Sequence, residues 1–420
     1  MSKLKILIVG AGGGREHALG WKIAQSPREG RLFFARGNAG TAELGTNLDI
    51  KETEITKLIE FGKEKRINLV LVVSDDPLAA GAVDEFQSAG FRTWGPCKAA
   101  AELESSKAFA KNFMKRHGLP TAKFEVFTNY ESTKKYLDTQ KLPIVVKASG
   151  LALGKGVVIC KTKEEAKKAL ENALVKKVFG EAGREVVIEE FLEGREISIH
   201  AFSDGRHYSI FPPAQDHKKI GEGNTGPNTG GMGTIAPLTV DMVRIEREII
   251  APTFAALREE GIEYKGVLYP GLILTKDGPK ILEYNARFGD PETQTYMRLL
   301  ETDLLDVVDA CIDGKLDQLE IKWKKEFACT IVLASGGYPG AYEKGKEISG
   351  IEEAEKDSNV VIFHAGTKVV TKRNLITNGG RVLGISVVGK TLQDALNTAY
   401  SAASKISFEG MQYRKDIGKY

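Results

Sequence analysis

The chain has 420 residues, enough for two to four domains, and its 42% hydrophobic content is that of a folded globular protein. Lysine and arginine exceed the acidic residues by only three (59 against 56), which gives no support for a nucleic-acid or membrane partner. The sequence lacks a run of ~20 apolar residues, which a membrane span needs, and its four cysteines have no zinc-type spacing. We therefore expect a cytoplasmic protein, either a monomer or a small homo-oligomer.

Strands alternate with helices over roughly the first hundred residues. Residues 4–9 (LKILIV) read as a buried strand, and a glycine-rich turn leads into a helix near 16–25. Further strands are expected at 32–35, 69–73 and 92–94, with helices near 55–66 and 79–89. The alternation predicts a doubly wound parallel sheet, and we assign residues 1–103 to this N-terminal domain.

The pattern changes from residue 104 onwards. A helix is expected at 105–117, with Ser105 or Ser106 as its N-cap. Strands near 143–148 and 157–161 are joined by a glycine-rich loop without a helix, which indicates an α+β unit on antiparallel sheet. The expected division is a central region at 104–325, with a lid subdomain at about 120–190, and a small C-terminal α+β domain at 326–420.

The turn Gly10–Glu16 lies between the first strand and its helix. Backbone N–H groups at such a turn can bind a phosphate, because glycine permits close approach and the helix start is partly positive. A dinucleotide site fits less well, since Arg15 stands where the third glycine of that motif would fall. A purely structural turn is the third reading.

A second glycine-rich loop runs from Lys147 to Gly156. It differs from a Walker A loop, because only three residues separate Gly150 from Gly154, where Walker A has four, and Lys155 precedes a glycine and then a strand. A mobile loop with a lysine at each side suits a lid over a triphosphate. A plain hairpin loop with solvated lysines is the alternative.

The segment 189–196 (EEFLEGRE) follows an apolar strand. Main-chain groups at the end of such a strand can bind an adenine edge, and Glu196 can accept bonds from ribose hydroxyls. A solvated acidic face is the alternative reading.

The segment 266–287 carries a candidate metal site. A strand at 267–275, a tight turn and a returning strand at 280–285 form a hairpin. Residues two apart on a strand face the same way, so Glu283 and Asn285 offer two oxygen ligands on one side, and Arg287 continues the row. A salt-bridged pair on an edge strand is the alternative.

A long polar loop, with QDHK at 215–218 and TGPNTGGMG at 225–233, contains almost no core-forming residues. Long loops of this kind in compact domains are often functional. The sequence shows no Ser-His-Asp or Cys-His pattern that would support a covalent nucleophile.

Taken together, the motifs resemble those of the phosphoribosylamine–glycine ligase family of ATP-grasp enzymes. The matching stretches run in order along the whole chain and include GGREHAL (13–19), GNAGT (37–41), SKAF (106–109), GLALGKGV (150–157), IEEFLEG (188–194), QDHK (215–218), TGPNTGGMG (225–233), NARFGDPETQ (285–294), HAGT (364–367), TNGGRVL (377–383) and RKDIG (414–418).

The resemblance implies a fold and a set of site residues. The fold is an N-terminal doubly wound domain, a central ATP-grasp fold of two α+β subdomains and a C-terminal domain. Glu283 and Asn285 are implied ligands of Mg²⁺ or Mn²⁺, and Arg287, Lys155 and Asp216 are implied catalytic residues. The implied ATP-binding residues are Lys107, Lys147, Gly154, Lys155, Glu189, Glu190, Phe191, Leu192 and Glu196. The implied substrate-binding residues are Gly12, Gly13, Gly14, Arg15, Glu16, Asn38, Asp75, Asp76, Asp216, Lys218, Asn228, Thr229, Gly230, Asp290 and Glu292.

The reaction implied by the family joins glycine to 5-phosphoribosylamine at the expense of ATP, through a glycyl phosphate, in purine biosynthesis. The N-terminal domain departs from the family at three places: an extra glycine in the first turn, Arg36 before GNAGT, and Asp75-Asp76 where the family has GPExPL. A fourth departure is Ser149 in the lid loop, where aspartate is usual. Two alternatives stay open: an ATP-grasp ligase that uses another amine, and an inactive nucleotide-binding relative.

Overall fold

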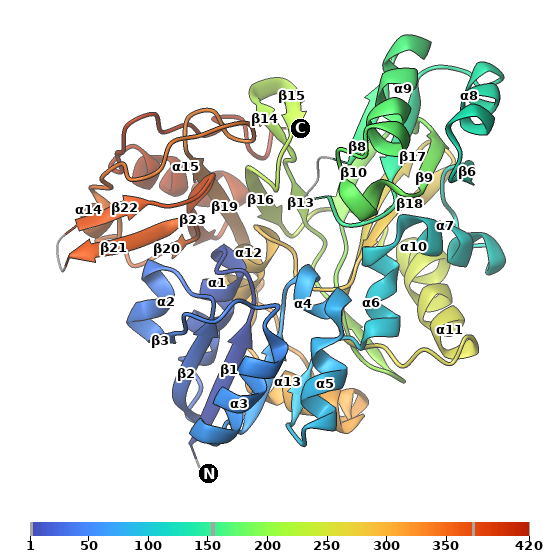
Figure 1. The fold of residues 1–420 in the computed structure, drawn as a ribbon. Coiled ribbons are helices and arrows are strands. Elements are labelled where there is room, and N and C mark those ends of the chain that lie inside the picture. The colour runs from blue at the N-terminus through green and yellow to red at the C-terminus, as the bar shows by residue number, and fades with distance from the viewer. Residues whose placement is uncertain (1–2, 153–155, 372–373, 420) are drawn as a thin grey trace.

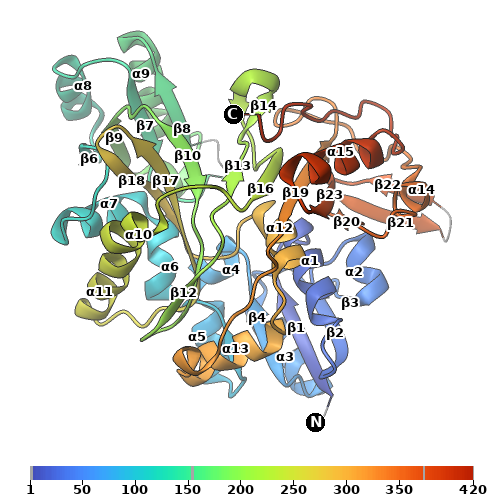
Figure 2. The ribbon, with the colours of Figure 1, turned by 180° about the vertical axis from the view of Figure 1, so that it is seen from behind.

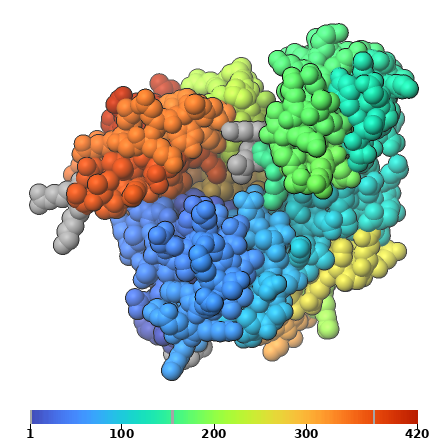
Figure 3. All heavy atoms as spheres, in the orientation of Figure 1, coloured from blue at the N-terminus to red at the C-terminus, as the bar shows by residue number. Residues whose placement is uncertain are grey.

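The computed structural model describes residues 3–152, 156–371 and 374–419. Figure 1 shows the N-terminal sheet at the lower left, the C-terminal region above it, and the segment with α8 and α9, the predicted lid subdomain, at the upper right. In the space-filling view of Figure 3 the C-terminal region and the lid subdomain stand apart above the N-terminal domain. Among the described residues, none of the helices has the length and apolar character to cross a membrane.

The N-terminal sheet is parallel, with the strand order β3-β2-β1-β4-β5. Leu7 and Val9 pack in one hydrophobic cluster and Ile6 and Ile8 in another, so both faces of the sheet are covered. The predicted doubly wound sheet is confirmed. Its strands are β1 Leu4–Val9, β2 Glu29–Ala35, β3 Gly45–Asn47, β4 Leu69–Val72 and β5 Thr93–Trp94. Its helices are α1 Gly14–Ile23, α2 Ala39–Leu44, α3 Ile55–Lys65, α4 Asp75–Ala80 and α5 Ala82–Ser88.

The single helix predicted near 79–89 is two helices, α4 and α5. Gly81 lies between them with φ of +88°, a conformation that ends the first helix and that glycine adopts without strain. The start of α4 at Asp75 is therefore earlier than the sequence indicated, and it brings Asp75 and Asp76 into a first helical turn.

Two helices, α6 Lys98–Ser105 and α7 Lys107–Arg116, lead into the lid subdomain. Ser106 is the N-cap of α7, because its hydroxyl accepts a hydrogen bond from the Phe109 backbone N–H (3.1 Å). The lid is an antiparallel sheet in the order β6-β9-β7-β8, covered by α8 and α9. Its elements are β6 Phe124–Phe127, α8 Tyr130–Asp138, β7 Ile144–Ala148, β8 Val157–Cys160, α9 Lys163–Leu170 and β9 Val186–Glu190.

A second antiparallel sheet forms the centre of the molecule, with β17 paired to β10, β11 and β18. Its strands are β10 Arg195–Ser198, β11 Ala201–Asp204, β12 Tyr208–Ile210, β17 Lys265–Thr275 and β18 Gly278–Asn285. The accompanying helices are α10 Met242–Ile245, α11 Ala251–Glu259, α12 Glu292–Leu299 and α13 Leu304–Asp313. Helix α12 packs against α1, β19 and β23, and Figure 2 shows it between the N-terminal and C-terminal sheets.

The third large sheet has the order β13-β16-β19-β23-β20, so β13 and β16 of the central region join the C-terminal strands. The segment 215–233, expected to be a structureless loop, instead contains short strands: β13 and β16 belong to the large sheet, while β14 and β15 pair only with each other. The strands of the large sheet are β13 Gln215–Asp216, β16 Gly233–Ala236, β19 Phe327–Ala334, β20 Val360–His364 and β23 Arg381–Gly389. Two separate pairs are β14 Lys219–Gly221 with β15 Thr225–Asn228, and β21 Thr367–Thr371 with β22 Asn374–Thr377. The helices of this region are α14 Ile351–Ala354 and α15 Leu392–Ala403.

Candidate functional site

The glycine turn after β1 meets the segment that precedes α12. Gly13 is the N-cap of α1, and the backbone N–H of Arg15 donates to Asp290 Oδ2 (3.4 Å). The Arg15 guanidinium donates to the Phe288 carbonyl (2.9 Å) and pairs with Glu16 (3.1 Å). The structure therefore brings the predicted residues Gly12–Glu16 and Asp290 together, with a carboxylate at the partly positive end of α1.

Arg381, at the start of β23, ties this turn to the C-terminal sheet. One of its NH groups lies 3.3 Å from Asp290 Oδ2, and the other donates to the carbonyls of Gly230 (2.5 Å) and Asp290 (2.6 Å). Burial opposes ionisation, but Arg381 and Arg15 together lower the pKa of Asp290. Arg381 belongs to the TNGGRVL motif, but the sequence alone did not predict a role for it.

The side chain of Asn38 forms hydrogen bonds with the glycine turn and with neighbouring backbone groups. Its buried amide donates to the carbonyls of Gly12 (3.0 Å) and His364 (2.7 Å), and its oxygen accepts from Thr41 N (3.1 Å) as the cap of α2. The side chain of Asn38 is therefore already bonded to the protein.

Asp75 and Asp76 begin α4. Asp75 is close enough to Arg287 and Glu104 to act on the charge of both. Burial, followed by the neighbouring charges of Asp75 and Glu52, raises the pKa of Asp76. Asp75 thus faces the centre of the site from the N-terminal domain.

Three lysines gather on the ATP-grasp side. Glu189 Oε2 accepts from Lys147 Nζ (3.0 Å) and Lys111 Nζ (3.2 Å), while Lys107 Nζ donates to the Gly150 carbonyl (3.2 Å). Lys111 was missed by sequence reasoning, although it lies one helical turn after Lys107. Burial lowers its pKa to about 8. The other oxygen of Glu189 is buried and has no hydrogen-bond partner within the described ranges.

The remaining ATP-binding candidates lie at the end of β9, in the residues that follow it, and in the loop before β8. Glu190 Oε1 accepts from the Lys123 backbone N–H (2.9 Å), and Glu196 is exposed on β10. Phe191 and Leu192 are half-buried in the connection between the two strands. Gly154 and Lys155 lie outside the described residues. A cleft of about 560 Å³ opens beside this region, with lining residues that include Ser106, Ser149, Gly150, Ala182 and Arg184.

The predicted metal ligands, Glu283 and Asn285, lie two residues apart on β18. Tyr284 between them bonds Thr253 (2.8 Å), while Glu283 faces Lys218 (Oε1 to Nζ 3.2 Å) and Asn285 Oδ1 accepts from Arg287 (3.2 Å). The charge of Lys218, aided by Lys147 and Lys107 against the opposing effect of burial, lowers the pKa of Glu283 to about 2. An ionised carboxylate and an amide oxygen are hard ligands that fit a divalent cation.

Two further carboxylates lie beside Lys218. Glu292 is buried and accepts a hydrogen bond from Ser198 Oγ at Oε1 (2.9 Å), and Asp216 is half-buried. Asp216 Oδ1 has no hydrogen-bond partner in the part of the chain that the structure describes. Burial and the charge of Glu292 raise the pKa of Asp216 well above its usual range. Burial opposes the charge of Lys218, but the nearby carboxylates outweigh it and raise the pKa of Lys218, so it stays charged. These carboxylates are Glu283, Glu196, Asp216 and Glu292.

Within the glycine-rich segment 228–231, Thr229 and Gly230 contact Lys218 and Arg381, whereas Asn228 lies elsewhere. Thr229 Oγ1 donates to the Lys218 carbonyl (2.8 Å), and Gly230 meets Arg381. A Cβ on Gly231 would lie 2.7 Å from Asp216 Oδ1, so the chain passes very close to that carboxylate. Asn228 instead lies on the β14–β15 hairpin opposite Lys219, and the structure does not bring its side chain to the group.

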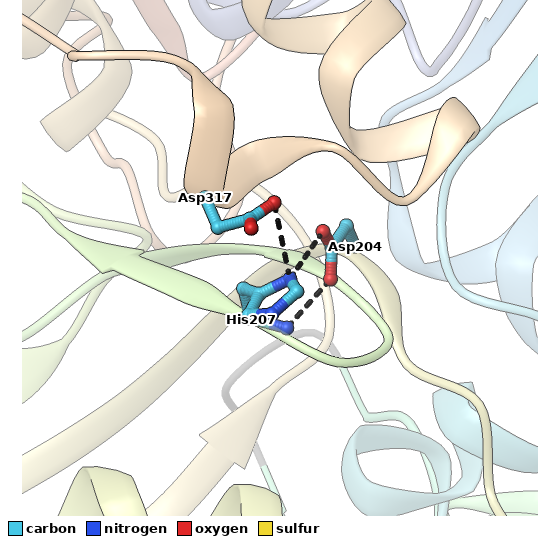
Figure 4. A group of neighbouring side chains, drawn as sticks. All are labelled: Asp204, His207 and Asp317. Atoms are coloured by element: carbon cyan, nitrogen blue, oxygen red, sulfur yellow. Dashed lines mark hydrogen bonds and ion pairs between the residues drawn. The ribbon is translucent and has the colours of Figure 1, made fainter.

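A separate group of ionisable side chains, Asp204, His207 and Asp317, lies at the β11–β12 turn (Figure 4). Asp204 accepts from the backbone N–H groups of Arg206, His207 and Leu316 and from His207 Nδ1 (3.1 Å). These bonds connect the turn to the segment after α13. They also satisfy the buried carboxylate of Asp204, so its burial needs no metal ion to explain it.

The lysines around Glu189, the carboxylate and amide oxygens on β18 and the antiparallel β6-β9-β7-β8 sheet are the features of an ATP-dependent ligase of the ATP-grasp class. Three domain families match the chain: phosphoribosylglycinamide synthetase N domain at 4–104, its ATP-grasp (A) domain at 105–293 and its C domain at 328–420. The chain belongs to the phosphoribosylglycinamide synthetase family.

Individual relatives agree with this assignment. The chain is 48% identical over 422 residues to the phosphoribosylamine–glycine ligase of Vibrio vulnificus, covering 99% of this chain and 98% of that protein. The crystal structure of the phosphoribosylamine–glycine ligase of Thermotoga maritima is similar with a TM-score of 0.86 and 37% identity, covering 98% and 100% of the two chains. The biotin carboxylase domain of the Hydrogenobacter thermophilus 2-oxoglutarate carboxylase shares the fold at 16% identity (TM-score 0.73, 98% and 92% covered).

Proposed function

We propose that the protein joins glycine to 5-phosphoribosylamine, converting ATP to ADP and phosphate and giving glycinamide ribonucleotide in purine biosynthesis. The family assignment and the names of the full-length relatives support this activity. The observation that carries it is the convergence of lysines, arginines and carboxylates from all three regions of the chain around β18 and the start of α1.

ATP binds between the lid and the central sheet in this proposal. Lys107, Lys147 and Lys155 face the phosphates, residues 189–192 hold adenine, and Glu196 holds the ribose. The buried, unpartnered oxygen of Glu189 supports the adenine assignment, because the 6-amino group of adenine would supply the missing donor.

ATP-grasp enzymes use ATP with divalent metal ions. Glu283 and Asn285 would hold Mg²⁺ or Mn²⁺ here, and the bound cation would offset negative charge on the phosphates. The low pKa of Glu283 supports this role, since a ligand carboxylate must be ionised.

Glycine is proposed to bind beside Lys218. Glu292 is buried and bonded to Ser198, and Asp216 is half-buried, with a buried oxygen that has no partner among the described residues. The α-ammonium group of glycine would supply the cation that this pair lacks. Its carboxylate would then point towards Arg287 and the triphosphate.

The chemistry needs no protein nucleophile. A glycine carboxylate oxygen attacks the γ-phosphorus of ATP, the bond to ADP breaks, and glycyl phosphate forms. The amine nitrogen then attacks the glycyl carbonyl carbon, the bond to the phosphate oxygen breaks, and the nitrogen loses one proton. Arg287 and the lysines offset the charge that develops on the phosphoryl oxygens, and a closed lid keeps water from the acyl phosphate.

The amine substrate is proposed to bind at the start of α1. Gly12–Glu16, Asp75 and Asp290 surround this point from two regions, and Arg15 and Arg381 supply positive charge. The domain limits 1–103, 104–325 with a lid at about 120–190, and 326–420 stay predictions, as does a monomer or small homo-oligomer.

The proposal is tested by measuring phosphate release from ATP with Mg²⁺ and glycine, with and without freshly prepared phosphoribosylamine. We expect release that requires both substrates, together with a product of the mass of glycinamide ribonucleotide. Release that requires glycine but ignores the amine would indicate another amine. If no phosphate were released in either assay, the proposed ligation would be contradicted.

A further inference from the structure

The carboxylate of Glu104 joins the last turn of α6 to the segment that follows β18. Its Oε1 lies 2.9 Å from an NH group of Arg287, and its Oε2 accepts a hydrogen bond from the Ala286 backbone N–H (2.8 Å). The Glu104 side chain is 9% exposed. The Glu104 carboxylate therefore bonds two consecutive residues, Ala286 and Arg287, which directly follow the proposed metal ligand Asn285.

The guanidinium of Arg287 is oriented by these contacts. It also donates to Asn285 Oδ1 (3.2 Å) and to the Phe288 carbonyl (3.2 Å), while its Nε is buried without a partner among the described residues. Burial opposes its charge, but Glu104 and the other nearby acids raise the pKa of Arg287, so it stays cationic.

Stability alone is a weak reason for this pair. A buried ion pair costs desolvation, and replacing one with apolar side chains is often neutral or stabilising. Glu104 also lies three residues before Lys107 and within charge range of Asp75, at the border between the N-terminal domain and the ATP-grasp core. Its position suits a group that orients its neighbours for catalysis.

We propose that Glu104 is a positioning residue that sets the place of Arg287 relative to the transferring phosphoryl group. It acts through its bond to the guanidinium and through the Ala286 N–H, which fixes the backbone between Asn285 and Arg287. The inference rests on the proposed function, because Arg287 is taken to face the phosphoryl group in the ligation.

The first test compares Glu104→Gln with Glu102→Gln, an exposed glutamate on the same helix. We expect Glu104→Gln to lower kcat about 30- to 100-fold, since misplacing a catalytic group by ~1 Å costs about this much. The KM for ATP should stay within about twofold of wild type, and the control should match wild type in both constants. A Glu104→Gln enzyme with the kcat of the control would overturn the proposal.

The second test asks whether Glu104 acts through Arg287. In an Arg287→Lys background, Glu104→Gln should lower kcat by no more than about twofold further, because residues that act as one unit are not additive. Losses that multiply would show an independent role and overturn the proposal.

If Glu104→Gln does not fold, Glu104→Asp serves in both comparisons, since it keeps the charge and shortens the reach by one methylene. Its expected kcat loss is again about 30- to 100-fold, and a wild-type kcat would overturn the proposal. The wild-type rate in the same assay tests the ligase activity by itself. Failure of the proposed function can therefore be told apart from failure of the role proposed for Glu104.

Discussion

Lys218 Nζ lies 3.2 Å from Glu283 Oε1, and this ion pair joins the 215–233 segment to the β17–β18 hairpin. The pair links the residues proposed to hold glycine with a ligand proposed to hold the metal ion. Because Glu196, Asp216 and Glu292 also act on Lys218, one cation sits among four carboxylates. A metal ion at Glu283 and a glycine ammonium at Asp216 would each add positive charge where the protein alone is acidic.

Glu283→Gln should lower ligation at least about 100-fold, since it removes the ionised metal ligand and keeps the side chain's shape. The variant should stay folded but melt at a lower temperature than wild type, because it loses the ion pair with Lys218 that lowers the pKa of Glu283. Turnover with saturating Mg²⁺ and thermal unfolding check both points. Asp277→Asn, at the turn of the same hairpin, is the matched control and should behave as wild type. Near-normal turnover of Glu283→Gln would make the metal assignment wrong.

Asp216→Asn should raise the KM for glycine about 10- to 100-fold, the loss expected for one charged hydrogen bond. The KM for ATP should not change. The variant should melt at or above the wild-type temperature, because burial and Glu292 already oppose the charge of Asp216. Steady-state kinetics and calorimetry measure these effects, with the exposed Asp49→Asn as control. An unchanged glycine KM would remove Asp216 from the glycine site.

Arg381→Lys should raise the KM for the amine substrate about tenfold while the KM for ATP stays constant. Lysine keeps the charge but cannot bond both Asp290 and the Gly230 carbonyl as the guanidinium does. Kinetics with varied amine at saturating ATP and glycine give the constants. Lys390→Gln, an exposed cation after the other end of β23, should leave them unaltered. An equal rise in the KM for ATP would point to a general loss of structure instead.

The interface between α1 and β20 should make stability depend on pH. His17 Nδ1 accepts from the His364 backbone N–H (2.8 Å); burial and the charge of His364 lower the pKa of His17 to about 3, and burial lowers that of His364 to about 4. Between these values and 6.5 the unfolded chain binds protons that the folded chain excludes. The stabilisation is therefore complete above pH 6.5 and is lost as the pH falls towards 3, by about 1.4 kcal/mol per pH unit for each group.

His17→Asn tests this expectation, because the amide oxygen can still accept the His364 N–H. The free energy of unfolding, measured by denaturant titration between pH 5 and 7, should fall less steeply with acid than in wild type. The difference in slope should approach about 1.4 kcal/mol per pH unit at pH 5 and be much smaller at pH 7, where the unfolded histidine is mostly neutral. Equal slopes for the two proteins would show that His17 titrates alike in the folded and unfolded states.

Local patterns predicted much of the fold. Apolar runs such as Leu69–Val72 identified the buried strands, and the turn at 276–278 between two strands identified the hairpin that carries Glu283 and Asn285. These features depend on residues that are close in sequence, where periodicity and turn chemistry decide the structure.

Long-range pairings could not be predicted from one sequence. Arg381 reaches Asp290 across 91 positions, and Glu104 reaches Ala286 across 182. The strands within 215–233 escaped notice because they are two to four residues long, and β16 is held by pairing with the distant strand β19. Residues such as Lys111 and Glu104 gain a role only through partners that tertiary packing supplies.

The most direct test of the account uses glycine labelled with ¹⁸O in both carboxylate oxygens. If the carboxylate attacks the γ-phosphorus and the amine then displaces phosphate, one labelled oxygen leaves with the phosphate and one stays in the amide carbonyl. Mass spectrometry of the released phosphate should therefore find one ¹⁸O per molecule during turnover with ATP and phosphoribosylamine. Phosphate without the label would contradict activation of glycine as an acyl phosphate, and with it the proposed mechanism.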